Sequence, residues 1–159
     1  MNNYQDYDIL EKRFLVSLNI SCFKGGFIVE QISKFLNSLY LGDRYCEKVE
    51  ISDKKIIFQI NCISRLKPGT NTWNYYTDED IEHGCLVFDE VKEHHSTSDL
   101  LFNEDIYEIT VLDKEDDIFT FLVQGSNLSD DLISTDIEMT IHAKKFYIYD
   151  PNNNSIVYS

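Results

Sequence analysis

Basic residues are scarce in this sequence. Its 159 residues include 14 Lys and Arg against 28 Asp and Glu, which gives a formal net charge of -14 at pH 7. Binding to nucleic acid requires a basic surface that neutralises phosphates, so we expect neither nucleic acid nor an anionic membrane as a partner. Long apolar runs are also missing, since none approaches the ~20 residues that span a bilayer. The acidic, polar start Met1–Asp8 is unlike a signal peptide, and we expect a cytoplasmic protein.

Complete catalytic and metal-binding signatures are missing as well. The sequence contains no GxSxG motif, no glycine-rich phosphate loop and no HExxH or HxH spacing. It also lacks a CxxC pair, which argues against a zinc ribbon or a thioredoxin-like motif. We therefore expect no cofactor and no bound metal. Because free cysteines are usually buried, we expect buried, reduced thiols at Cys22, Cys46, Cys62 and Cys85. The spacing of the cysteines alone leaves disulfides open.

The negative charge is concentrated in one stretch, Asp78–Asp117. This stretch holds 15 Asp and Glu against two Lys, whereas the rest of the chain holds 13 acidic and 12 basic residues. Such an asymmetry is typical of a surface that attracts cationic partners. Because 43% of the residues are hydrophobic and 13% are aromatic, the chain has enough apolar material for a folded core.

The apolar spacing predicts one amphipathic helix followed by strands. Between residues 28 and 41 the apolar positions recur at i, i+3, i+4 and i+7, and Gly42 is suited to end a helix there. Further along, the period changes to two. Alternation or apolar pairs mark strands at 49–51, 56–62, 86–88, 107–111, 119–123, 137–143 and 156–158.

Short turns between these strands favour a mainly β (α+β) fold, an antiparallel sheet or sandwich with the helix near residues 28–41. We expect residues 28–159 to form a single domain. Residues 1–27 are either an N-terminal extension or a first strand, because residues 16–22 also alternate.

Metal chemistry has one candidate region. His94 and His95 form the only histidine pair, with His83 upstream and acidic residues nearby, and imidazole with carboxylate is a credible ligand set. Adjacent residues on a strand point to opposite faces, so we favour a solvated loop at His94–His95. Calcium binding by Asp78–Glu82 is not expected, because the glycine and the closing Glu of a calcium loop are misplaced.

An aromatic cluster borders the acidic stretch and includes the only Trp. Aromatic rings beside carboxylates are typical of a protein-binding hot spot, although rings can equally close the end of a sheet. The predicted partner-binding residues are Trp73, Tyr75, Tyr76, Asp78, Glu79, Asp80 and Glu82. Asp43 and Arg44 follow the helix and Arg65 follows a strand, so these three residues are predicted to form a structural ion pair between helix and sheet.

One pattern of segments stands out: Phe35–Leu36, Tyr40–Cys46, Ile63–Arg65, Trp73–Tyr76, Asp78–Ile81 with Gly84, and Leu86–Phe88. With this pattern the chain resembles an uncharacterised family of small acidic bacterial proteins. The resemblance spans residues 28–150, departs before Ile28 and is most specific in its middle block. Residues 137–151 are more loosely similar to immunity proteins of bacterial polymorphic toxin systems. The resemblance implies a bacterial, cytoplasmic, β-rich domain with immunity-like binding, and it carries over no catalytic residue.

These observations favour a non-enzymatic acidic protein that binds a basic protein, such as an immunity protein against a basic toxin. Two alternatives stay open. One is a metal-dependent enzyme that uses the region of His83, His94 and His95. The other is an inhibitor whose carboxylates imitate the phosphates of DNA. The sequence leaves the oligomeric state undetermined.

Overall fold

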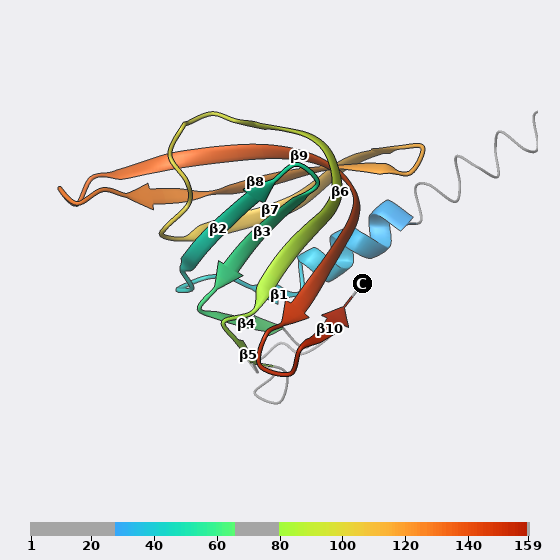
Figure 1. Cartoon of the computed structure of the whole chain (residues 1–159), viewed down its shortest axis with the longest axis horizontal. Helices are drawn as coiled ribbons and strands as arrows, with labels where there is room; N and C mark the ends of the chain where they lie inside the picture. Colours follow the sequence, from blue (N-terminus) through green and yellow to red (C-terminus); the bar gives the residue numbers. More distant parts are fainter. Residues whose placement is uncertain (1–27, 66–79, 159) are drawn as a thin grey trace, which may run out of the picture.

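The computed structural model describes residues 28–65 and 80–158, which form one short helix and ten strands. The predicted extension or strand within residues 1–27 lies outside the described residues. The helix covers residues 28–36. The strands are β1 (Leu39–Tyr40), β2 (Cys46–Ser52), β3 (Lys55–Ile60), β4 (Cys62–Arg65), β5 (Ile81–Glu82), β6 (Cys85–Ser96), β7 (Ile106–Glu115), β8 (Ile118–Leu128), β9 (Ser134–Asp150) and β10 (Ser155–Tyr158), as labelled in Figure 1.

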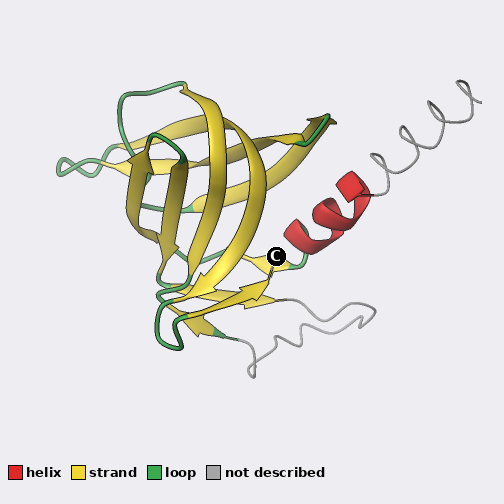
Figure 2. Ribbon diagram, turned by 45° about the vertical axis from the view of Figure 1, so that its right-hand side comes forward, coloured by secondary structure: helices red, strands yellow, loops and turns green. Residues whose placement is uncertain are grey.

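Seven strands form one antiparallel sheet in the order β2-β3-β6-β9-β8-β7, with β10 added to β9. The sheet is strongly curved (Figure 2). Its two edges meet at one point, where Tyr45 bridges to Asp105 and the Cys46 amide donates to the Glu104 carbonyl at 2.7 Å. The short strands β1, β4 and β5 form a second antiparallel sheet. The mainly β, antiparallel fold predicted from the sequence is confirmed.

The predicted alternation sets the register of the long strands. Ile109 lies opposite Val123 and Val111 lies opposite Phe121 across the β7–β8 hairpin, as the pattern predicts. These side chains point into the core together with the apolar residues of β9. The β9 residues of the core are Ile137, Met139, Ile141 and Ala143, all at most 1% exposed.

Phenylalanine rings form the centre of this core. Phe58, Phe88 and Phe121 are 0% exposed, and Phe102 is 2% exposed. Phe88 meets Phe58 at a centroid distance of 5.8 Å and Phe121 at 5.1 Å, both nearly edge to face. Such pairs contribute about 0.5–1.5 kcal/mol each beyond the burial of their area.

The helix is shorter than the sequence predicts. It ends at residue 36 instead of 41, and Ser38 donates from both its amide and its hydroxyl to the Phe35 carbonyl. Leu39 and Tyr40 then form β1, opposite Arg65 and Ser64 of β4. Leu36, Leu39 and Tyr40 have the spacing of a helix, whereas Leu39 and Leu41, buried at alternate positions, have the spacing of a strand. Pairing with β4 therefore decides the conformation, and Gly42 follows a strand.

Two further boundaries differ from the predicted ones. The strand expected over residues 56–62 ends at Ile60. At Asn61 the backbone amide donates to the Tyr45 carbonyl, and the backbone carbonyl accepts from the His83 amide. Cys62 consequently belongs to β4 in the second sheet. His94 and His95 lie within β6 and not in a loop, and both are exposed.

Three cysteines are described, and all are free thiols. Cys46 is buried, whereas Cys62 and Cys85 are half-buried. Burial raises the pKa of the Cys46 thiol to about 12. The reduced state predicted for these three is confirmed, and full burial holds for Cys46 alone. Cys22 lies outside the described residues.

Candidate protein-binding face

Six carboxylates gather on the outer side of β7 and β9, on the adjoining end of β6 and on the segment just before β7. In an antiparallel sheet, residues directly opposite each other point to the same side. Glu108 lies opposite Gln124, which lies opposite Glu138, so all three share the side that faces away from the core. We call this surface the acidic face, and it comprises Glu93, Glu104, Glu108, Asp113, Asp136 and Glu138.

Two bulges in β7 shape this surface. The register shifts between Ile106 and Glu108 and again between Val111 and Asp113. Each bulge adds one residue, which turns outward beside the next, so Tyr107 and Leu112 join the carboxylates on the outer side. Both side chains are 54% exposed. The result is apolar area at the border of an acidic surface.

Neutral side chains donate hydrogen bonds to the carboxylates of the acidic face. The Tyr107 hydroxyl donates to Asp136 at 3.2 Å, and the Gln124 amide donates to Glu138 at 2.7 Å. Glu104 accepts hydrogen bonds from the hydroxyls of Ser126 and Ser134, both at 2.8 Å. These contacts hold the carboxylates in place without cancelling their charge.

No Lys or Arg forms an ion pair with a carboxylate of the acidic face anywhere in residues 28–65 and 80–158. The nearest cationic candidate is His142, whose Nε2 lies 3.8 Å from Glu93, while its Nδ1 lies 3.2 Å from the Thr120 hydroxyl. Unpaired carboxylates on one side of a sheet produce a local negative potential.

Other carboxylates of the acidic stretch are neutralised by lysines. Lys145 lies 2.5 Å from Glu90, and its hydrogen bond lowers the pKa of that carboxyl. Lys144 lies 2.5 Å from Asp117 and lowers the pKa of Asp117 in the same way. Asp89 accepts from Lys55 and from the Tyr147 hydroxyl, both at 3.3 Å. The stretch that is acidic in sequence is thus divided in space into a paired and an unpaired part.

The acidic face differs from the partner-binding set that the sequence predicts. Trp73, Tyr75, Tyr76, Asp78 and Glu79 lie outside the described residues. Asp80 and Glu82 are exposed, and Glu82 lies in β5 of the second sheet. Asn152 donates to the Glu82 carbonyl at 2.8 Å, which places β5 beside the chain that follows β9. Glu138 stands near the opposite end of β9, 12 residues before Asp150, which is ~40 Å along the strand at ~3.3 Å per residue.

The two histidine regions are also far apart. His83 precedes β6 and bonds Glu47 through Nδ1 at 2.8 Å, whereas His94 and His95 lie at the other end of that strand. The bond to Glu47 raises the pKa of His83. In the described residues no group of three or more His, Cys, Asp or Glu is arranged to hold a metal ion. The predicted metal region therefore does not come together as one site.

The two arginines near the helix act without Asp43. Arg44 donates to the Ser64 hydroxyl at 3.5 Å and lies over the Tyr40 ring at 5.7 Å. Arg65 donates to the Ser38 hydroxyl at 3.4 Å, so both arginines tie the region after the helix to β4. Asp43 is exposed with a φ of 52°, and no ion pair joins it to either arginine. Asp43, Arg44 and Arg65 therefore do not form the predicted three-residue ion pair with one another.

Comparison with known proteins identifies a family. The model of the family of unknown function DUF6258 matches residues 30–157. The chain belongs to this family. No curated protein and no solved structure matches the chain. The family match supports the resemblance to an uncharacterised family expected from the sequence and assigns no activity. No helix within the described ranges is long and apolar enough to cross a membrane.

Proposed function

We propose that this DUF6258 protein is a non-enzymatic binding module that recognises a basic protein through its acidic face. Neutralising a basic toxin, as an immunity protein does, is a function that fits this proposal. The observation that carries it is the placement of Glu108, Asp113, Asp136 and Glu138 on one side of an antiparallel sheet, none of them paired with Lys or Arg in the described structure.

The arrangement suits recognition for two physical reasons. Tyr107 and Leu112 supply exposed apolar area that a partner can bury, and tyrosine is enriched among residues that dominate binding energy. The carboxylates supply long-range attraction, and complementary charge raises association rates by roughly 10–10³-fold. Because the carboxylates are held by Gln124, Ser126 and Ser134, little side-chain order has to be gained on binding.

Charge reversal on the acidic face tests the proposal. In the double variant Glu108→Lys/Glu138→Lys the net charge rises by four, and we expect association with the basic partner to slow at least ~10-fold at low salt. The matched control is Glu30→Lys/Asp53→Lys, which adds the same charge on the helix and in the β2–β3 turn. Equal loss in both variants would show that net charge alone matters, and it would contradict a defined face.

A third double variant separates the acidic face from the set predicted from the sequence. Asp80→Lys/Glu82→Lys adds the same charge near β5. Loss of binding in this variant alone would move the binding surface to the segment before β5. If DNA competes with this protein for the same partner, the result would favour an inhibitor whose carboxylates imitate the phosphates of DNA.

A further inference from the structure

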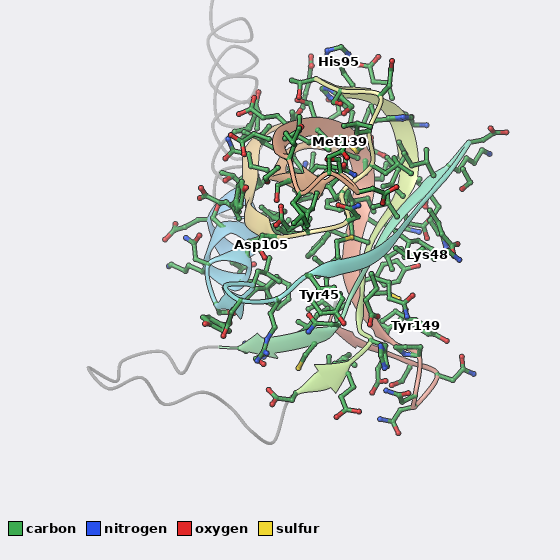
Figure 3. All side chains as sticks on the ribbon, turned by 90° about the vertical axis from the view of Figure 1, so that its left-hand side faces the viewer. Tyr45, Lys48, His95, Asp105, Met139 and Tyr149 are labelled. Atoms are coloured by element: carbon green, nitrogen blue, oxygen red, sulfur yellow. The ribbon has the colours of Figure 1, made fainter. Side chains whose placement is uncertain are left out.

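β2 is an edge strand whose outer side is open in the described structure. It pairs with β3 along its length, and on its other side only the residues at its start meet the chain, through the Tyr45–Asp105 bridge and the bond from the Cys46 amide to Glu104. Figure 3 faces this side of the molecule, and there β2 runs from Tyr45 past Lys48 until its far end projects beyond the neighbouring ribbon. Open edges are templates for pairing with another chain.

The two edges of the main sheet are protected to different degrees. β7, at the opposite edge, contains two bulges within ten residues, and bulges disrupt the ladder that a partner strand would need. β2 has one bulge near its start, followed by five regular pairs with β3 over Lys48–Ser52. A second strand can therefore continue the sheet at β2 more readily than at β7.

The side chains of Lys48–Ser52 alternate between the core side and the solvent side of the sheet. Val49 lies opposite the buried Phe58 and Ile51 lies opposite the buried Ile56, so both point to the core side. Ile51 is nevertheless 40% exposed, because no strand among the described residues covers this edge. Lys48 and Glu50 point to the other side and form an ion pair of 2.5 Å, with their side chains 60% and 54% exposed.

We infer that β2 pairs antiparallel with β2 of a second copy of this chain, about a two-fold axis at Val49. In this register Lys48 of each copy lies opposite Glu50 of the other, so the contact contains two complementary charge pairs. The two Val49 side chains meet on the core side. The interface is self-complementary in charge although each copy carries a net charge of -14.

Neighbouring registers are less favourable. A one-residue slip would set core-facing residues of one copy opposite solvent-facing residues of the other. A two-fold axis at Lys48 would oppose two lysines, and an axis at Glu50 would oppose two glutamates, which is destabilising for residues directly opposite. The pattern Lys48-Val49-Glu50 therefore selects one register.

Two charge-reversal variants, measured separately and then mixed with each other, test this pairing. An interface this short is expected to have a dissociation constant of about 1 µM to 1 mM, measurable by sedimentation equilibrium over that range. Measurements at ~0.15 M salt screen the long-range repulsion between copies, while adjacent charges still interact. Lys48→Glu and Glu50→Lys should each weaken self-association about tenfold or more, because each places like charges opposite each other. An equimolar mixture of the two variants should restore association, because in the mixed dimer each Glu of one copy lies opposite a Lys of the other.

The mixture can be followed pair by pair in the Val49 register. The K48E chain carries two acidic side chains at these positions and the E50K chain carries two basic ones. In the mixed dimer each acidic side chain of one copy therefore lies opposite a basic side chain of the other, so both opposed pairs are complementary. Each variant alone opposes only like charges.

The exposed pair Glu30–Lys34 on the helix provides matched controls, since the variants Glu30→Lys and Lys34→Glu reverse a similar ion pair away from the edge. They should leave self-association unchanged. Thermal unfolding of each variant verifies that the fold persists. A wild-type chain that stays monomeric up to ~1 mM, or a mixture no more associated than its two components, would overturn the inference.

Cysteine substitution tests the register directly. Residues opposite each other in an antiparallel pair have Cα atoms about 4.5–5.5 Å apart, within the range of a disulfide. Val49→Cys should therefore form a disulfide-linked dimer under mild oxidation. Ser52→Cys should not, because the two copies of residue 52 would lie ~20 Å apart. Efficient linking through residue 52 instead would exclude the Val49 axis.

Discussion

Replacement of Gly125 by alanine should destabilise the fold, because the backbone of the β6–β7 connection lies against this glycine. A Cβ at residue 125 would lie 2.3 Å from the Asp105 carbonyl oxygen and 2.9 Å from the Phe102 ring. The nearer of these is a backbone atom, so relief requires the whole segment before β7 to move. That segment carries Glu104 and leads into Tyr107, so it also positions one end of the acidic face.

The expected cost follows from the size of the clash. Insertion of one carbon into a well-packed core costs about 1–3 kcal/mol, occasionally more. For a domain of this size each kcal/mol lowers the melting temperature by about 2–4 °C, so the variant should melt about 2–12 °C lower. Calorimetry or urea unfolding measures this directly.

Gly42→Ala is the matched control for this substitution. The nearest atoms to a Cβ there are in the Tyr40 side chain at 3.3 Å, and Gly42 is exposed. Removing a glycine also restricts the unfolded chain, so the control should be neutral or slightly stabilising. Equal stability of Gly125→Ala and the wild type would refute the close approach of Asp105 to β8.

Two further predictions concern titratable side chains. Because the pKa of His83 is raised, its pair with Glu47 stabilises the fold below the ordinary histidine pKa of about 6.5, and this stabilisation is lost as the pH rises through the pKa of the folded state. NMR titration should show that Glu47→Gln lowers the pKa of His83. An unchanged pKa would contradict the contact. Cys46 should resist alkylation at neutral pH in the folded protein, because it is buried and its pKa is raised to about 12. Peptide mapping after alkylation of the folded protein measures this. Modification of Cys46 as fast as that of Cys85 would be inconsistent with its burial.

Much of the sheet could be predicted, because alternation with period two is a strong signal where one face is buried. The strands around Val111, Phe121 and Ile141 show it plainly and form as predicted. The second half of β6 lacks the signal. Its residues 92–95 are all exposed, so His94 and His95 give no alternation and their strand could not be recognised.

The end of the helix could not be predicted from local spacing. Leu36, Leu39 and Tyr40 continue a helical pattern, while Leu39 and Leu41 also fit a strand. The choice depends on pairing with Ser64 and Arg65, which are distant in sequence. Tertiary pairing thus overrides the local pattern.

The acidic stretch was visible in the composition, but the acidic face was not. Asp136 and Glu138 belong to a different segment and join Glu108 only through the register of β8 with its two neighbours. The bulges that turn out Tyr107 and Leu112 have no sequence signal, and the neutralising lysines Lys144 and Lys145 lie far along the chain.

The central claim is that a basic protein binds the acidic face. The most direct measurement is capture of partners from a lysate of the source cell, with the proteins encoded beside this one expressed, at low and at high salt. Wild type and Glu108→Lys/Glu138→Lys would serve as baits. The account predicts one basic protein that wild type retains at low salt, releases at high salt and loses in the variant. A partner retained equally by both baits, or no basic partner at either salt concentration, would contradict it.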